Sequence, residues 1–264
     1  LAIELCDKFD RSTILKADSQ KEFASSQRYM RGLFSGGTLA YETLLVLRAF
    51  VKGIYSNIPI DISYKLDDAA VSHEHTVIDM GEDEFTVGRL HPMIDSDLRL
   101  RRFKQEAVDP ETAVILLDVV LGYGSHPNPA AELAPIISEA KSLARRSGRY
   151  LEVVVLMVGT ESDPQDVVAQ TKILRQSGAH IETNADKAAI YVGNIIVTLN
   201  PSSKASLRPV ILDRSRQSLA AINVGLESFY ESLVRQGAEA IHVDWQPPAQ
   251  GNENLMNLLA KMKG

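Results

Sequence analysis

One loop of the sequence combines glycines with side chains that can handle charge. The segment 118–129 reads DVVLGYGSHPNP and contains Gly122, Gly124, Ser125 and His126. Glycine lets backbone amides approach an anion closely, and a serine hydroxyl can donate a hydrogen bond to it. The imidazole can contact an anion, transfer a proton or accept a phosphoryl group. We expect anion contact at His126 and no covalent phosphorylation; the alternative is a loop histidine bonded only to backbone.

Three further turns have the same character. Ser-Gly-Gly-Thr at 35–38 supplies Gly36, Gly37 and Thr38, and Thr38 is the predicted N-cap of a helix. Free amides and the helix dipole favour an anion at such a helix start. A tight turn and cap without a ligand explain the same residues equally well. Gly81 and Thr160 lie in the other two turns, and we expect both to contact the same ligand.

The segment 79–95, DMGEDEFTVGRLHPMID, gathers several kinds of charge. Arg89 can hold a carboxylate or phosphate through two parallel hydrogen bonds, and His91 follows two residues later. The acidic residues before them can bind magnesium or neutralise the arginine. A polar loop with internal ion pairs is the alternative. We predict that Arg89, His91 and His126 are the residues that act on the substrate.

Several other kinds of site are not indicated. His73 and His75 would face one side of a strand, but no third ligand has convincing spacing, so we predict no metal site. The single Cys6 excludes a multi-cysteine zinc site and a disulfide framework. The sequence contains no G-x-S-x-G, Walker A or G-x-G-x-x-G motif.

The elements that must position these turns alternate between strand and helix. Short β-branched runs end in glycine turns and are followed by helical patterns, which predicts a flavodoxin-like α/β fold with a mostly parallel sheet and helices on both faces. Asp163 is the expected N-cap of one helix, and 58–64 has short strand potential. The expected strands are 28–34, 75–80, 113–120, 151–158 and one near His180, and the expected helices are 38–51, 96–107, 129–146, 164–177 and 185–192.

Composition shifts suggest three parts. Residues 1–27 form a lead-in segment, 28–200 the main domain and 201–264 a small α/β appendage that begins with a polar linker. The appendage has predicted strands at 221–224 and 240–243 and helices at 226–235 and 253–262, with Pro247 and Pro248 between the last two elements. It is too small to be comfortably stable alone, so we expect it to pack on the main domain or on a partner.

Composition also limits the partners. The 264 residues are 45% hydrophobic and 23% charged, with a formal net charge of -6 and no dense block of lysine and arginine. Binding to nucleic acid or to an anionic membrane is therefore not expected. No apolar run approaches the roughly 20 residues that span a bilayer, and no signal-peptide pattern is present. We expect a cytoplasmic protein.

Long segments of the chain resemble the C-terminal half of the FdrA proteins, which are acyl-CoA synthetase-like relatives of succinyl-CoA synthetase. The resemblance covers roughly residue 27 to the end and is carried by RGLFSGGTLAYE (31–42), IDMGEDEFTVGRLHPMID (78–95), LLDVVLGYGSHPNPA (116–130), VGTESDPQ (158–165), INVGLESF (222–229) and HVDWQPPAQG (242–251). It implies that 28–200 is a ligase-type domain whose glycine turns contact phosphate. The histidine motif of the synthetase α subunit is absent, as are the ATP-grasp and CoA-binding Rossmann domains. The chain would then be half of a split protein or a fragment.

The resemblance implies two related activities. One is acyl-CoA synthetase-like chemistry. The other is the oxamate carbamoyltransferase of ureide (allantoin) breakdown, which passes a carbamoyl group to phosphate. We expect a subunit that binds phosphate or acyl phosphate, in an oligomer with a Rossmann-type half or other subunits. No tightly bound cofactor is expected, and CoA or magnesium would bind only transiently. A structural subunit that supports a catalytic partner is the alternative.

Overall fold

The computed structural model describes residues 22–201, 219–245, 255, 256 and 261. The chain divides into two units, 1–207 and 208–264, which are described separately. The expected helix at 253–262 is described only at residues 255, 256 and 261, all helical. Pro247 and Pro248, together with most of the lead-in segment and of the polar linker, lie outside the described residues.

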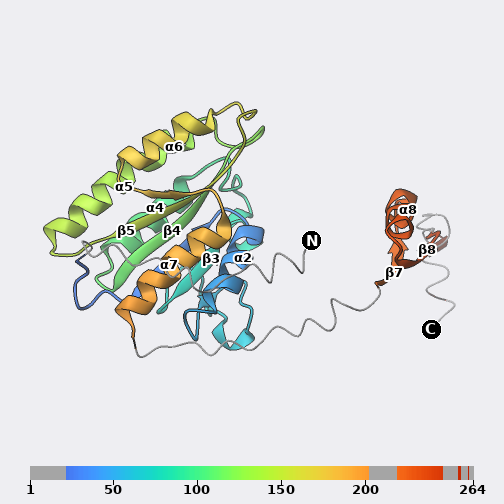
Figure 1. The fold of residues 1–264 in the computed structure, drawn as a ribbon, viewed down its shortest axis with the longest axis horizontal. Helices are drawn as coiled ribbons and strands as arrows, with labels where there is room; N and C mark the ends of the chain where they lie inside the picture. The colour runs from blue at the N-terminus through green and yellow to red at the C-terminus, as the bar shows by residue number, and fades with distance from the viewer. Residues whose placement is uncertain (1–21, 202–218, 246–254, 257–260, 262–264) are drawn as a thin grey trace. The chain divides into compact units, whose positions relative to one another are not determined.

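The first unit is built on a parallel sheet (Figure 1). Its strands are β1 (Tyr29–Phe34), β2 (Tyr55–Ser56), β3 (Thr76–Asp79), β4 (Thr112–Val120), β5 (Glu152–Val158) and β6 (His180–Glu182). They lie in the order β2-β3-β1-β4-β5-β6, and every described pair is parallel. β4 lies between β1 and β5, so the most apolar run is central. The predicted parallel α/β fold is confirmed.

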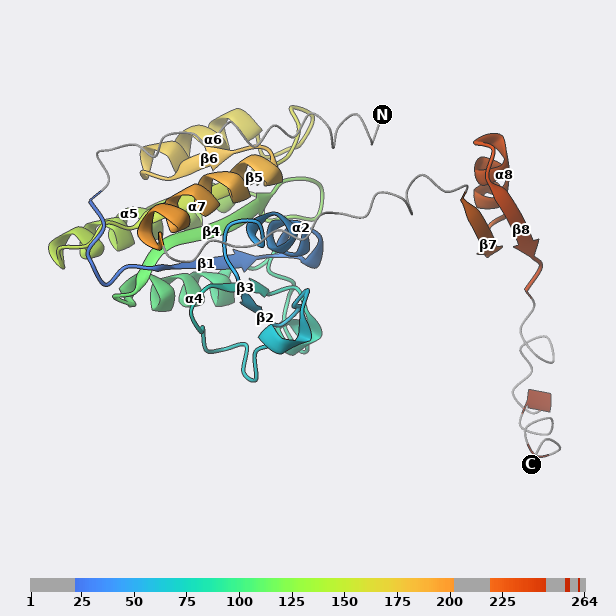
Figure 2. The same cartoon turned by 60° about the horizontal axis from the view of Figure 1, so that its bottom comes forward.

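Helices cover both faces of this sheet (Figure 2). They are α2 (Gly37–Leu47), the short α3 (Asp83–Thr86), α4 (Asp97–Val108), α5 (Pro129–Arg146), α6 (Val167–Gln176) and α7 (Ala185–Leu199). Residues of α4, α5 and α6 share one hydrophobic core with the sheet, and residues of α2 and α7 share the other.

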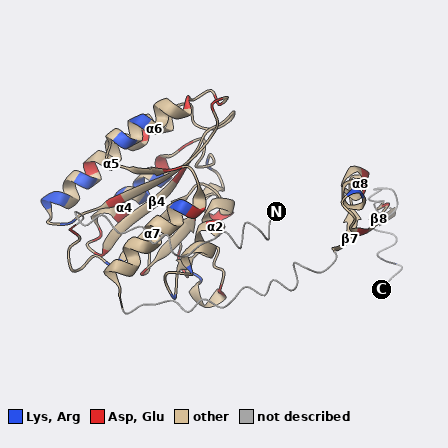
Figure 3. Cartoon of the chain, viewed as in Figure 1, with Lys and Arg blue, Asp and Glu red and all other residues tan. Residues whose placement is uncertain are grey.

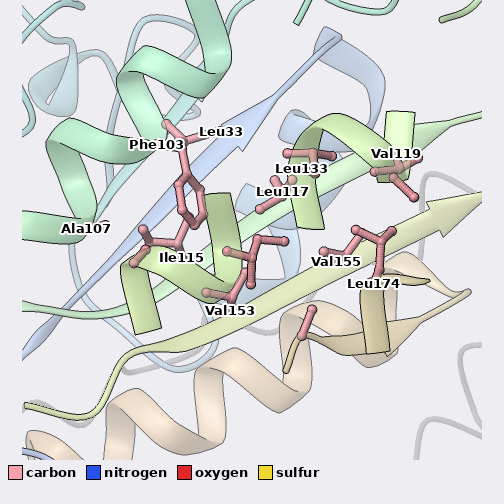
Figure 4. Packing of buried hydrophobic residues seen from close by; sticks show 14 of the residues in the cluster. Leu33, Phe103, Ala107, Ile115, Leu117, Val119, Leu133, Val153, Val155 and Leu174 are labelled. Carbon is pink, nitrogen blue, oxygen red and sulfur yellow. The ribbon is translucent and has the colours of Figure 1, made fainter. Parts of the chain in front are cut away.

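Successive side chains of the buried strands point alternately into the two hydrophobic cores. Ile115, Leu117 and Val119 of β4 face the α4–α5–α6 side, where Phe103 and Leu133 pack against them (Figure 4). Val114 and Leu116 face the α2–α7 side instead. Successive side chains of a strand point to opposite faces, so a strand covered on both sides must be apolar at consecutive positions. This explains why β4 was recognisable from sequence.

Several local expectations are wrong, among them the end of the helix expected at 185–192, which runs to Leu199. The short strand lies at Tyr55–Ser56, and Ile62–Tyr64 forms a 3-10 turn started by Asp61, whose carboxylate accepts from the Ser63 amide. Gly36, not Thr38, is the N-cap of α2. The helix after β5 begins at Val167 and is capped by Asp166, whereas Asp163 accepts a hydrogen bond from the Thr160 amide at 2.6 Å. In the last case Asp166 satisfies the first turn of the helix, because its carboxylate accepts from the amides of Val168 and Ala169.

The second unit is a single β-α-β element. It contains β7 (Ala220–Val224), α8 (Glu227–Arg235) and β8 (Glu239–Val243), and the two strands pair in parallel. These bounds agree with the predicted strands and helix. No helix within the described ranges is both long and apolar enough to cross a bilayer.

Candidate functional site

The predicted site residues follow strands that are all parallel. Because parallel strands end at one edge of a sheet, the turns after β1, β3, β4 and β5 emerge together at the carboxyl edge. β1 and β4 are neighbours, but α2 follows β1 on one face and α5 follows β4 on the other. Such a topological switch point is the usual ligand position in an open α/β sheet.

Asp118 joins these two central strands. Its carboxylate accepts hydrogen bonds from the amide of Ser35 at 2.8 Å and from the hydroxyl of Ser35 at 2.5 Å. Arg99 on α4 forms an ion pair with it, with 2.8 Å between Nη1 and Oδ1, and also bonds its carbonyl. Both side chains are buried, and such a pair needs these extra hydrogen bonds to offset the loss of water. Asp118 therefore fixes the turn after β1.

A second buried carboxylate, Asp79, ends β3. Its Oδ1 accepts the Gly81 amide at 2.8 Å, and a Cβ placed on Gly37 would lie 2.8 Å from its Oδ2. Burial raises the pKa of Asp79, and the negative charges of Glu82 and Asp118 raise it further. The Gly81 hydrogen bond and nearby His91 act in the opposite direction. A carboxyl group that resists ionisation thus lies beside the first residue of α2.

His91 and His126 are connected to this region through Gly81 and Met93. A Cβ on Gly81 would lie 2.9 Å from His91 Nε2 and 2.8 Å from the Ser35 carbonyl. The amide of His126 donates to the Met93 carbonyl at 2.7 Å, and a Cβ on Gly36 would be 3.5 Å from the Met93 methyl. The turns after β1, β3 and β4 therefore contact one another.

The turn after β4 is held mainly by Gln165. Its side chain accepts from the Gly122 amide at 3.0 Å and donates to the Gly122 carbonyl at 2.7 Å. It also donates to the His126 carbonyl at 3.3 Å. The His126 ring is directed to Glu132 of α5, with 3.2 Å between Nε2 and Oε1. Ser125 is half-buried and Gly124 is exposed.

Other predicted residues lie further from these contacts. Arg89 is exposed on the loop between α3 and α4, and within the described ranges its side chain has no ion pair or hydrogen bond. Thr38 and Thr160 are also exposed. His73 and His75 precede β3 instead of lying on it, and no cluster of three or more His, Cys, Asp or Glu among the described residues could hold a metal ion.

Sequence reasoning missed four polar residues that organise the edge: Asp79, Arg99, Asp118 and Gln165. One signal was available, because Asp118 stands inside an otherwise apolar run. A charge in a buried strand requires a partner. Nothing in the sequence identified that partner as Arg99.

A family model and a protein of known sequence both match this chain. A family model described as CoA-ligase matches residues 33–195, which include every predicted site residue. YahF of Escherichia coli (strain K12), an uncharacterized protein, is 38% identical over 182 residues. The alignment covers 69% of this chain but 35% of YahF, so the chain spans about a third of that relative's length.

Proposed function

The chain belongs to the CoA-ligase family, and on that premise we propose that it is an FdrA-type subunit of a cytoplasmic acyl- or carbamoyl-transferring enzyme. Its carboxyl edge would bind phosphate or an acyl phosphate. The observation that carries this proposal is the start of α2 at the switch point, where Gly36 is an N-cap without a side-chain hydrogen bond.

The first turn of α2 supplies the binding groups. The first amides of a helix have no acceptor within the helix, and here no side chain from the described residues caps them. Gly36 and Gly37 carry no Cβ, so an anion can approach the backbone closely. Helix α5 begins after the turn of β4, with Pro129 in its first turn, and would direct a second positive end toward the same edge.

Asp79 imposes a condition on the ligand. A phosphate dianion beside Gly37 would lie near this carboxyl group, and two negative charges repel. The pKa of Asp79 is raised, and once protonated this carboxyl group can donate a hydrogen bond to phosphate. Phosphate should therefore bind more tightly as the pH falls through the range in which Asp79 takes up its proton.

Arg89, His91 and His126 would stabilise the negative charge of the ligand. His91 lies beside Gly81, and Arg89 two residues earlier would reach the ligand by moving its exposed side chain. His126 would approach from the turn after β4. Transfer of an acyl or carbamoyl group to a phosphate oxygen requires positioning and charge stabilisation, and no nucleophile of this chain is needed. A Rossmann-type half or another subunit would bring the rest of the reaction, with CoA or magnesium bound transiently.

Calorimetry with inorganic phosphate and with carbamoyl phosphate tests the site. We expect Gly37→Asp to abolish binding, because it adds a like charge where the backbone must meet the anion. Arg89→Ala should weaken binding by about 1.5–3 kcal/mol if a charge-assisted hydrogen bond is lost. Arg146→Ala removes the same charge from the exposed end of α5 and should change nothing. Unchanged affinity in both site variants would contradict the proposal.

One observation favours the alternative, a structural subunit that supports a catalytic partner. Asp79 lies beside the first residue of α2, and in its ionised form it would neutralise part of the field at this helix end. On this view phosphate does not bind, and site variants keep the complex active while removal of the chain makes the partner insoluble. Measuring the activity of the complex with each site variant, and the solubility of the partner without this chain, distinguishes the two functions.

A further inference from the structure

Helix α2 carries large hydrophobic residues on its outer side as well as on its inner side. Ala40, Leu44 and Leu47 are buried against the sheet. On the opposite side Tyr41 is 43% exposed and Leu45 is 46% exposed. Large hydrophobic side chains that stay exposed beside charged ones are a candidate contact surface.

The helices on the other face of the sheet also expose single hydrophobic residues, Leu143 of α5 and Val168 of α6, but they differ in charge. Helices α5 and α6 carry charged residues along their length, while α2 and α7 are drawn mainly in the neutral colour (Figure 3). α6, for example, presents Lys172 and Arg175 outward. The contrast between the two faces is therefore one of charge: α2 has fewer charged residues than α5 and α6.

The exposed residues of α2 and its C-cap form one stripe. Residues three and four apart lie on the same face of a helix. Glu42 lies three positions before Leu45, and Arg48 lies three positions after it. The stripe consists of Thr38, Tyr41, Glu42, Leu45 and Arg48.

The two charges of this stripe have no partner of their own. Glu42 and Arg48 are separated by about 9 Å along the helix axis, too far for an intrahelical pair. Within the described ranges, neither side chain makes an ion pair or a hydrogen bond. Two unpaired opposite charges therefore flank an exposed apolar centre symmetrically.

We propose that this stripe is the contact between two copies of the chain, with their α2 helices antiparallel about a two-fold axis at Leu45. A two-fold interface must be complementary to itself. This arrangement places Leu45 against Leu45 of the second copy. Glu42 then lies at the level of Arg48 of the second copy, and the reciprocal pair forms as well. Tyr41 of each copy covers the apolar seam.

The symmetry of the stripe selects a second copy over a different partner. An unrelated protein would need complementarity to the stripe, but it would not require opposite charges at equal spacing around one apolar residue. The exposed helix is about 16 Å long, shorter than interfaces of stable dimers usually are. The dimer should therefore dissociate in the micromolar range, with the neighbouring outer side of α7 adding to the contact.

Sedimentation of the full chain between about 1 and 200 µM tests the proposal. The wild type should be a reversible dimer. Glu42→Arg and Arg48→Glu should each weaken association about tenfold or more, because each replaces two attractive pairs with two repulsive ones. An equimolar mixture of the two variants should regain the dimer, since position 42 of each copy then meets the opposite charge at position 48 of the other.

Two controls show whether a loss of association comes from the stripe itself and not from misfolding. Lys172→Glu reverses a charge on the opposite face and should leave association unchanged. Circular dichroism and thermal melting show whether each variant is folded. A monomeric wild type over the whole range overturns the proposal, as expected if another segment of the chain or a different partner covers α2. The proposal is also overturned if neither Glu42→Arg nor Arg48→Glu weakens the dimer, or if mixing these two variants does not restore it.

Discussion

The two sides of the carboxyl edge use glycine for different reasons. After β1 and β3, a side chain would not fit. A Cβ at position 37 would lie 2.8 Å from Asp79 Oδ2, and a Cβ at position 81 would lie 2.8 Å from the Ser35 carbonyl. After β4, glycine is required by backbone conformation, because φ is +136° at Gly122 and +87° at Gly124. A Cβ on Gly124 would have no neighbour within 4 Å.

The difference shows how each side is held in place. The side formed by the turns after β1 and β3 is packed around two buried carboxylates, so its shape depends on side chains. The turn after β4 is open and depends on its own dihedral angles and on Gln165. Variants that remove a charge, fill a space or change a backbone preference should therefore affect the two sides unequally.

The largest effect should come from Asp118→Ala. It leaves Arg99 buried without its partner, and breaking one half of a buried pair typically costs about 3–5 kcal/mol. Urea unfolding measures this loss of stability. Asp97→Ala is the matched control, because its ion pair with Arg101 is exposed and is worth less than about 1 kcal/mol. Similar losses in both variants would show that the edge is not organised by Asp118.

Alanine at Gly81 and at Gly124 compares the two kinds of glycine directly. Gly81→Ala must displace the Ser35 carbonyl or His91, and overpacking of this kind costs about 1–3 kcal/mol. Gly124→Ala meets no atoms but must adopt a left-handed conformation, which costs about 1 kcal/mol. Thermal melting should rank Gly81→Ala as the less stable variant. The reverse order would mean that backbone conformation governs both sides.

The pH dependence of stability should distinguish Asp79 from its asparagine variant. The folded-state pKa of Asp79 is raised, so its protonation contributes to the free energy of unfolding. This contribution is fully present at low pH. It is lost as the pH rises from the ordinary pKa of 3.8 through the folded-state pKa. Asp79→Asn does not titrate. Unfolding curves from about pH 3 upward should therefore show the variant gaining stability relative to the wild type. A constant difference across this range contradicts the prediction.

The smallest change in stability should follow His126→Ala on the open side. The His126–Glu132 contact is partly exposed, and such pairs are worth about 1 kcal/mol or less. Phosphate affinity should nevertheless decrease if His126 contacts the ligand. Glu132→Gln removes the same ion pair and keeps the imidazole, so it should keep the affinity. Equal affinity in both variants would remove His126 from the proposed site.

Sequence predicted the sheet well because its strands are recognisable from local patterns. β4 and β5 are continuous apolar runs, and Pro129–Arg146 was recognisable from its proline start and basic end. The packed side of the site could not be found in this way. Ser35 and Asp118 are 83 positions apart, and only the order of the strands makes them neighbours. The cap at Asp166 was missed because it adopts a left-handed conformation that is uncommon outside glycine.

The bond between Ser35 and Asp118 also limits how the protein can admit a ligand. It ties the turn after β1 to the end of β4, and separating them would break two hydrogen bonds to a buried carboxylate. The central strands β1 and β4 should therefore keep their relative position when a ligand binds. A ligand would then enter and leave past the exposed loops of this edge, around Arg89 and around Gly124.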